Sequence, residues 1–267
     1  MNVTAGVVRR LEASAAAATV EIAAGLARVD PPQRPRTVSM GGGALVAFGP
    51  GRYVNRGVGV SLSELTDDDA DVIERFFVDR GLPPALELSA WAPAATTSLL
   101  RRRRYAVSSF RSMFAATPAM VAAAPVDGVS VVAVADRDVD RWVAVFTAGF
   151  EVDEPVARAV SDEFARAVNE TPGSSQFLAI VDGQPAGCGS LHVVGAVGWL
   201  GAAATMPAFR NRGVQRALVH YRTFVAQERA CDLVTATAVP TGASARNLRR
   251  LGFDHVQDQV IVERHER

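Results

Sequence analysis

A short arginine-rich turn between an apolar run and an amphipathic run carries the residue types that bind phosphate. The segment 207–218 reads Pro-Ala-Phe-Arg-Asn-Arg-Gly-Val-Gln-Arg-Ala-Leu. The first amides of a helix lack partners within the helix and carry partial positive charge, so they attract a diphosphate. Gly213 allows the backbone to approach such a ligand closely. We therefore expect a phosphate-binding turn that leads into a helix.

Three further side chains are candidates for moving a proton or for binding a cationic amine. Glu151 and Glu154 form an acidic cluster with Asp153, where a carboxylate could accept the proton of an amine or attract its charge. The alternative is that the cluster is the acidic start of a helix that begins at Pro155. His192 stands in a strand-like run, where a single histidine is more often packed or exposed than catalytic.

The charge balance argues against a nucleic-acid partner. The 267 residues include 28 basic and 28 acidic side chains, and the formal net charge is +0. All the basic residues are arginine, which we attribute to genomic base composition, so the protein has no lysine of its own to acylate. The run Arg101–Arg104 is a candidate phosphate or nucleic-acid patch. We favour a structural role, because the run ends a predicted helix and nucleic-acid binders show a broader basic surface.

Cysteine usage and hydropathy indicate a reduced, cytoplasmic protein. Cys188 and Cys231 lie in apolar runs, where free cysteine behaves as a small buried residue, and no spacing of Cys and His resembles a zinc site. The alanine-rich N-terminus is interrupted by Glu12 and Glu21 and does not resemble a signal peptide. No apolar run approaches the roughly 18 residues that a membrane span requires. We expect neither a metal nor a membrane partner.

Hydrophobic periodicity and turn residues predict an α/β fold with a mixed sheet, built from two successive groups of elements. The first group is predicted to contain helices at 4–28, 67–80 and 96–104 and strands at 36–48, 53–62, 85–91 and 105–114. The second is predicted to contain helices at 139–150, 155–169, 213–229 and 243–250 and strands at 129–134, 177–181, 186–194, 197–205, 233–238 and 255–262. The Ala- and Pro-rich segment 115–128 is predicted to link them.

The two groups share an order of elements and several residues, which predicts an internal duplication. Each contains the order helix, strand, short helix, strand. At an offset of 147, Arg75, Phe77, Val78, Leu86 and Pro93 match Arg222, Phe224, Val225, Leu233 and Pro240. At an offset of 148, Leu100–Arg102 match Leu248–Arg250.

The duplication provides a comparison for the phosphate-binding turn. At the offset of 147, that turn aligns with Ser63–Asp69, which reads Ser-Glu-Leu-Thr-Asp-Asp-Asp. This segment is a good helix start, because its aspartates complement the helix dipole. The same aspartates would repel a diphosphate, and the glycine is absent. Only the second copy is therefore expected to hold an anionic ligand.

The second group resembles the GNAT superfamily of acyl-CoA-dependent N-acyltransferases. That family carries an Arg/Gln-x-x-Gly-x-Gly/Ala turn between its fourth strand and third helix, and Arg210, Gly213 and Gln215 stand at these positions. The segment 205–210 resembles the preceding strand end, and 244–253, which ends in Gly-Phe, resembles the second conserved block. The resemblance implies two tandem GNAT-like halves, each with a mixed, mostly antiparallel sheet flanked by helices.

The resemblance also implies how acetyl-CoA, or another acyl-CoA, is bound. Amides at the helix start hold the diphosphate, arginines add charge-assisted contacts, and the open edge of the preceding strand pairs with the pantetheine amides. A backbone N–H of that strand stabilises the oxyanion formed when an amine attacks the thioester. The residues expected to bind the cosubstrate are Ala203, Ala204, Thr205, Met206, Arg210, Asn211, Arg212, Gly213, Val214, Gln215 and Asn247. For Asn247, local helix capping is the alternative role.

Three positions depart from the family pattern. Gln215 replaces the usual Gly or Ala, and it either points outward or crowds the phosphate. Leu248 stands where the family often has a tyrosine that protonates the departing thiolate, and 197–205 lacks the glutamate that often acts as base through water. The usual acid and base are therefore missing, although an amine that arrives deprotonated and a thiolate that leaves readily can react without them.

The sequence thus predicts an N-acetyltransferase that acts on a primary amine, that of a small molecule in particular, by direct attack in a ternary complex. Residues 1–124 are expected to form a degenerate half without a phosphate-binding turn, and residues 125–267 the acyl-CoA-binding half. The chain is expected to be a monomer with an internal pseudo-dimer or a homodimer. The alternatives are a catalytically impaired CoA-binding regulator or sensor, and a nucleotide-binding module that uses the same turn.

Overall fold

Helices and strands alternate along the computed structural model, which describes residues 1–122 and 124–264. The helices are α1 (Ala5–Val29), α2 (Asp67–Val78), α3 (Ala94–Arg102), α4 (Val139–Gly149), α5 (Pro155–Asn169), α6 (Val214–Glu228) and α7 (Ala243–Arg250). The strands are β1 (Arg36–Met40), β2 (Gly43–Ala47), β3 (Asn55–Val58), β4 (Ala85–Ser89), β5 (Tyr105–Ala116), β6 (Val129–Ala133), β7 (Ser174–Val181), β8 (Gln184–Val194), β9 (Val197–Thr205), β10 (Leu233–Ala238) and β11 (Asp254–Arg264).

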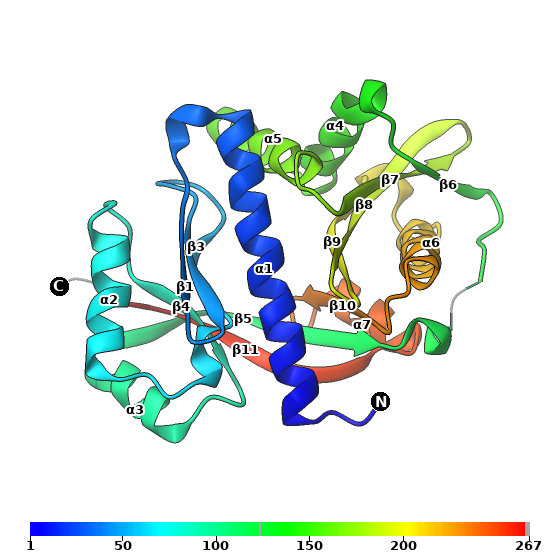
Figure 1. Cartoon of the computed structure of the whole chain (residues 1–267). Coiled ribbons are helices and arrows are strands. Elements are labelled where there is room, and N and C mark those ends of the chain that lie inside the picture. Colours follow the sequence, from blue (N-terminus) through cyan, green and yellow to red (C-terminus); the bar gives the residue numbers. More distant parts are fainter. Residues whose placement is uncertain (123, 265–267) are drawn as a thin grey trace.

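These strands join one continuous sheet in the order β1-β2-β3-β4-β11-β5-β10-β9-β8-β7-β6 (Figure 1). The order is symmetric about the central β11–β5 pair, because β4 and β10 flank that pair and in turn pair in parallel with β3 and β9. The last strand of each half lies beside a strand of the other half: β11 pairs antiparallel with β4, and β5 with β10. The predicted mixed α/β fold is confirmed, whereas this exchange of strands was not predicted.

Three segments of the first half differ from the predicted elements. The segment 36–48 is not one strand but the hairpin β1–β2, whose turn places Gly41 and Gly42 at positive φ of 58° and 85°. The segment 53–62 contains the short strand β3 followed by a 3-10 turn. The predicted linker 115–128 begins inside β5, because pairing with β10 extends that strand.

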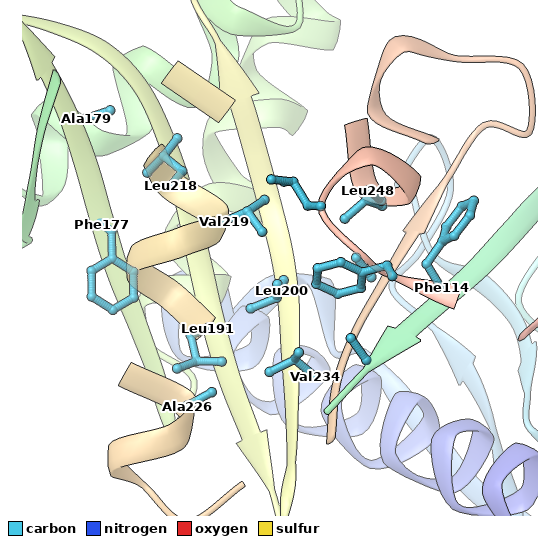
Figure 2. Close-up of a cluster of buried hydrophobic side chains, with 14 of the residues drawn as sticks. Phe114, Phe177, Ala179, Leu191, Leu200, Leu218, Val219, Ala226, Val234 and Leu248 are labelled. Carbon is cyan, nitrogen blue, oxygen red and sulfur yellow. The ribbon is translucent and has the colours of Figure 1, made fainter. Parts of the chain in front are cut away.

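The two faces of β8 and β9 pack against different helices. Gly187 on β8 faces α6, where a Cβ would lie 2.6 Å from Val214, whereas the next residue, Cys188, shares a core with Trp142 of α4. Successive residues of a strand point to opposite faces, so α6 and α4 cover opposite sides of the sheet. Figure 2 shows side chains of α6 and α7, Leu248 among them, gathered with Leu200 of β9.

Helix α1 packs on strands and helices of both halves, with contacts to β2, β3, β8, β9 and α5 (Figure 1). It buries one carboxylate: Glu12, 1% exposed, accepts hydrogen bonds from Nε2 of Gln257 at 2.5 Å and of Gln259 at 2.9 Å. Burial, reinforced by the negative charge of Glu87, raises the pKa of Glu12 to about 7. The contact between α1 and β11 therefore contains a carboxyl group that titrates near neutrality.

The arginine run has a structural role in the first half. Arg103 lies 2.8 Å from a carboxylate oxygen of Asp67 and 2.6 Å from one of Asp71, both on α2. These ion pairs join the end of α3 to the acidic first turns of α2. The placement agrees with the structural role expected for the run.

Candidate functional site

Strands β9 and β10 separate along their length, which leaves one edge of β9 open. Their parallel pairing covers only Val197–Trp199 with Leu233–Thr235, and in the described chain the backbone from 200 to 205 has no ladder partner on the β10 side. An open strand edge presents N–H and C=O groups with which an extended, amide-containing ligand can pair. The predicted cosubstrate residues Ala203, Ala204 and Thr205 lie on this edge, and Met206 follows it.

A bulge deforms β9 within this open edge. One residue of β8, Gly189, opposes two residues of β9, Ala202 and Ala203. Ala202 has a left-handed φ of 41°, a conformation that residues with a side chain seldom adopt. Bulges redirect the backbone beside binding sites. Here the bulge turns the peptide groups of β9 in the part of the strand that has no β10 partner.

The open edge leads into the turn at the start of α6, whose N-cap residue is Gly213. Its φ is 79°, and a Cβ would lie 2.7 Å from Cγ1 of Val126, so both the backbone angle and the packing require glycine. Asn211 is also left-handed, with φ of 64°. Because Gly213 has no side chain that could cap the helix, the first amides of α6 stay available to an anion.

The corresponding helix of the first half uses these amides itself. Thr66 caps α2 by accepting a 3.2 Å hydrogen bond from the backbone N–H of Asp69, whose carboxylate accepts a 2.9 Å bond from the N–H of Thr66. This reciprocal capping box occupies two of the donors that a phosphate would need. The two helix starts therefore differ as the sequence predicted: α2 is capped and acidic, and α6 has no side-chain cap.

The two arginines of the α6 turn form ion pairs with neighbouring loops. Arg210 Nη2 lies 2.6 Å from Glu151 Oε2, and Arg212 Nη2 lies 2.8 Å from Asp182 Oδ2. Arg212 also lies over the ring of Phe209. Since all four charged groups are partly exposed, these ion pairs are weak enough for a phosphate to compete with the carboxylates.

Glu151 is thereby brought close to the open strand. It follows α4, whose last residue, Gly149, packs so tightly that a Cβ there would lie 2.6 Å from the Cβ of Ala204. Arg210 Nη2 also lies 3.4 Å from the carbonyl oxygen of Gly149. Of the three candidates for proton transfer or amine binding, Glu151 is the one that the structure places beside the turn and the end of β9.

The other two candidates have different surroundings. Glu154 is the N-cap of α5, where its carboxylate accepts hydrogen bonds from the N–H groups of Ala157 and Val156, and these bonds lower its pKa. His192 is buried on β8, with Nε2 3.1 Å from a carboxylate oxygen of Glu21 on α1. Burial lowers the pKa of His192, which the Glu21 carboxylate opposes only in part.

Gln215 points away from the turn and towards α7. Its Oε1 accepts a 2.6 Å hydrogen bond from Nδ2 of Asn247, and its Nε2 donates a 2.5 Å bond to Oγ of Ser244. These contacts hold the side-chain amide of Gln215 towards α7, and they show that Nδ2 of Asn247 donates to Gln215. The predicted residues of the turn and of α7 are therefore joined by one hydrogen-bonded chain.

The positions that lack the family's acid and base are apolar in the structure. Leu248 is 3% exposed and belongs to the core under α7, so it supplies no acid (Figure 2). No residue of β9 is a carboxylate. Within the described part of the chain, no three Cys, His, Asp or Glu side chains gather as metal ligands do. Over the same residues, none of the helices combines the length and hydropathy needed to cross a membrane.

Arg222 is a buried residue that the sequence analysis did not select as functional. It lies on α6, is 2% exposed, and donates hydrogen bonds to the carbonyl oxygens of Ser190 and Gly201 beside the β9 bulge. Its one signal in the sequence was its identity with Arg75 at the offset of 147. Arg75 is exposed on α2, so that identity does not extend to the surroundings.

Comparison with known proteins assigns the part of the chain that contains this site. Residues 139–253 match the model of the acetyltransferase (GNAT) family. The match includes the candidate carboxylates, the open strand, the turn and α7. No curated protein matches the sequence.

Solved structures share the fold over larger parts of the chain. A GCN5-related N-acetyltransferase from Kribbella flavida is 18% identical, with a TM-score of 0.68 over 96% of each chain. Another from Sphaerobacter thermophilus is 19% identical, with a TM-score of 0.54 over 68% of this chain and 59% of that one. A tandem GNAT protein from the clavulanic acid biosynthesis pathway is 16% identical, with a TM-score of 0.50 over 71% of this chain and 67% of that one.

Proposed function

Because residues 139–253 carry a domain of the acetyltransferase (GNAT) family, we propose that the protein transfers an acetyl or another acyl group from acyl-CoA to a primary amine. The observation that carries this proposal is the continuity of two features. The open edge of β9 runs directly into a helix start whose N-cap, Gly213, leaves the amides free of a side-chain cap. An extended amide arm that ends in a diphosphate needs both features in this order.

The residues present fit acyl-CoA as cosubstrate. The amides from Asn211 to Gln215 would hold the diphosphate, with Arg210 and Arg212 exchanging their carboxylate partners for phosphate oxygens. The edge from 203 to 206 would pair with the pantetheine amides. Asn247 would contribute by holding Gln215 away from the phosphates, as its 2.6 Å hydrogen bond does here.

The chemistry follows as a direct attack. The nitrogen lone pair of a neutral amine forms the new C–N bond at the thioester carbonyl, a β9 amide stabilises the negative oxygen, and the C–S bond then breaks to release the thiolate. The proton lost by the amine passes to water or to Glu151, whose loop packs on the end of β9. Glu151 would also attract the cationic form of the amine before it loses its proton.

The first half, residues 1–124, would serve as a structural half without a cosubstrate site of its own. The capping box of Thr66 and Asp69 occupies amides at the start of α2, and the aspartates of its first turn would repel a diphosphate. We propose one CoA site per chain, in residues 125–267. A small-molecule amine is the simplest acceptor for a site bordered by α1, the α4–α5 loop and β9.

A second candidate function is a CoA-binding regulator without turnover. The observation that favours it is the apolar position Leu248 together with a β9 that carries no carboxylate. Such a protein would keep the phosphate-binding turn and would lose the proton transfers.

The test combines binding with turnover. Titration calorimetry with CoA is expected to give one site per chain, and release of free thiol from acetyl-CoA is expected with at least some members of a panel of primary amines. Rates should rise with pH as each amine loses its proton, because the enzyme supplies no strong base. Tight CoA binding without thiol release from any amine would favour the regulator. Displacement of CoA by ATP would favour a nucleotide-binding module, and absence of CoA binding would contradict both CoA-dependent functions.

A further inference from the structure

Arg222 is a buried cation without a buried anion. Its guanidinium donates hydrogen bonds only to backbone carbonyl oxygens among the described residues: Nε to Leu218 at 3.0 Å, and Nη1 to Ser190 at 3.0 Å and Gly201 at 3.1 Å. Burial lowers its pKa to about 10, so the side chain is still charged at neutral pH. A buried charge without an ionic partner is costly for a fold. An apolar side chain at this position of α6 would avoid that cost. The presence of arginine therefore indicates a function for its buried hydrogen-bond donors.

The guanidinium occupies the inside of the β9 bulge. A Cβ on Gly189, the single β8 residue opposite the bulge, would lie 2.8 Å from Cζ of Arg222, so glycine there makes room for the cation. Ser190 and Gly201 are paired residues of β8 and β9, and both of their carbonyl oxygens accept from the same Nη1. Arg222 therefore holds the two strands together at the point where their ladder is interrupted.

The hydrogen bond to Gly201 fixes the direction of the next amide. In a planar trans peptide the C=O and the following N–H point in opposite directions. Because the carbonyl of Gly201 points to Arg222, the N–H of Ala202 points away from Arg222. At this residue β9 has no ladder partner in β10. A cation on the carbonyl also polarises the peptide unit and makes its N–H a stronger donor.

We propose that Arg222 is a positioning residue for acyl transfer, which holds the β9 bulge so that the amide of Ala202 donates to the thioester carbonyl oxygen. The inference rests on the proposed function and adds to it the amide that acts and the side chain that aims it. Arg222 itself touches neither the thioester nor the amine. Its effect is expected on the reacting carbonyl and not on the diphosphate, which binds at the other end of the open edge.

The variant that tests this role is Arg222→Met, with Arg75→Met as a matched control. Methionine keeps an unbranched apolar stem and removes the donors and the charge of the guanidinium, and Arg75 stands 147 residues earlier on the exposed face of α2. The direct readout is the infrared carbonyl band of bound acetyl-CoA labelled with ¹³C at the thioester carbon. A donor to the carbonyl oxygen lowers the frequency of that band.

We expect the wild type and Arg75→Met to shift the band to lower frequency on binding, and Arg222→Met to lose most of the shift. The Kd for CoA should change by less than about threefold, while kcat falls by about ten- to a hundredfold, a smaller loss than removal of an oxyanion donor itself causes. Arg222→Lys keeps the charge and should restore part of both the shift and kcat.

Several results would overturn the assignment. One is a wild-type band shift and kcat in Arg222→Met. Another is a parallel loss of CoA affinity, kcat and thermal stability that lysine does not relieve, because that pattern belongs to a purely structural residue. If Arg222→Met fails to fold, Arg222→Lys takes its place. A carbonyl band and a kcat equal to those of the wild type in Arg222→Lys would then contradict the assignment. If the wild type bound no acetyl-CoA, the proposed function would fail first, and this role with it.

Discussion

Asn247 donates a 2.6 Å hydrogen bond to Oε1 of Gln215, and this contact joins α7 to the first turn of α6. Gln215 is the second residue of α6, and Asp68, 147 residues earlier, is the second residue of α2. The two halves therefore place an amide and a carboxylate at equivalent positions of equivalent helices. This relationship allows the phosphate-binding turn to be tested without disturbing Gly213, where any side chain would collide with Val126.

The first prediction concerns the charge at this position. Gln215→Glu keeps the size of the side chain and can still accept from Asn247, and a carboxylate in the first turn does not destabilise a helix. The new charge adds a negative group to the first turn of α6, beside the amides that would hold the diphosphate, so the Kd for CoA in calorimetry should rise by about tenfold, equivalent to about 1.4 kcal/mol. Asp68→Asn is the matched control and should leave the Kd unchanged. Equal effects of the two substitutions, or an unchanged Kd in Gln215→Glu, would contradict the assignment of the turn.

A second prediction separates the two neighbouring glutamates. Glu151 is held at the open strand by Arg210, whereas Glu154 caps α5. Glu151→Gln should raise KM for a cationic amine by about fivefold, in line with about 1 kcal/mol for an interaction at a partly exposed charge. Steady-state kinetics at varied amine concentration measure this effect.

Glu154→Gln serves as its control, because it should lower thermal stability slightly and leave KM for the amine unchanged. A larger effect on KM from Glu154→Gln than from Glu151→Gln would reverse the two roles.

Much of the fold could be predicted because the local signals agree with the tertiary structure. Apolar periodicity predicted α6, and the acidic segment that ends at Asp69 predicted the capped start of α2. The hairpin at 36–48 was missed because Gly41 and Gly42 were included in one predicted strand, although consecutive glycines are typical of a hairpin turn. The exchange of β5 and β11 depends on pairing between residues more than 100 positions apart, which no local pattern records.

Some residues of the candidate site could likewise be predicted from the sequence, and others could not. Gly213 and the residues around it follow a spacing that the sequence shows directly. Arg222 could not be recognised, because its role depends on a bulge in two other strands and on the space left by Gly189. Glu151 is distinguished from Glu154 by its ion pair to Arg210, a tertiary contact that the sequence does not show, whereas Glu154 caps α5 locally.

A third prediction concerns pH and the buried carboxyl group of α1. The pKa of Glu12 is raised from 4.5 to about 7 in the folded protein, so the native state binds the proton more tightly than the unfolded chain does. The contribution of Glu12 to the free energy of unfolding is therefore greatest at low pH, and it decreases as pH rises from about 4.5 to 7.

Glu12→Gln resembles the protonated form and should remove this dependence. Chemical unfolding at pH 8 should show the variant to be more stable than the wild type by roughly 1–3 kcal/mol, with a much smaller difference at pH 5. Glu228→Gln, at the exposed end of α6, is the control and should leave the free energy of unfolding unchanged at both pH 8 and pH 5. A variant that is less stable than the wild type at pH 8 would show that the ionised carboxylate stabilises the contact.

A fourth prediction follows from the position of β11 between β4 and β5. Val262 of β11 is 6% exposed and packs in the core of the first half, although it belongs to the last strand of the chain. Val262→Ala should lower the unfolding free energy by about 2 kcal/mol. Trp91 reports on the first half and Trp142 on the second, so fluorescence of single-tryptophan variants should show both signals moving together.

Val72→Ala is the control for this experiment, since Val72 is 44% exposed on α2 and should have little effect. Separate transitions at the two tryptophans, with only Trp91 affected by Val262→Ala, would mean that the halves unfold independently.

The exchange of β5 and β11 between the two halves also has a consequence for the evolution of such a chain. A segment that binds no ligand is ordinarily free to be shortened or deleted. Here β5 supplies the neighbour of β10 and covers one edge of β11, so deletion of the first copy would expose the sheet of the second. The first half therefore completes the sheet around β10 and β11, a structural contribution that does not depend on a ligand of its own.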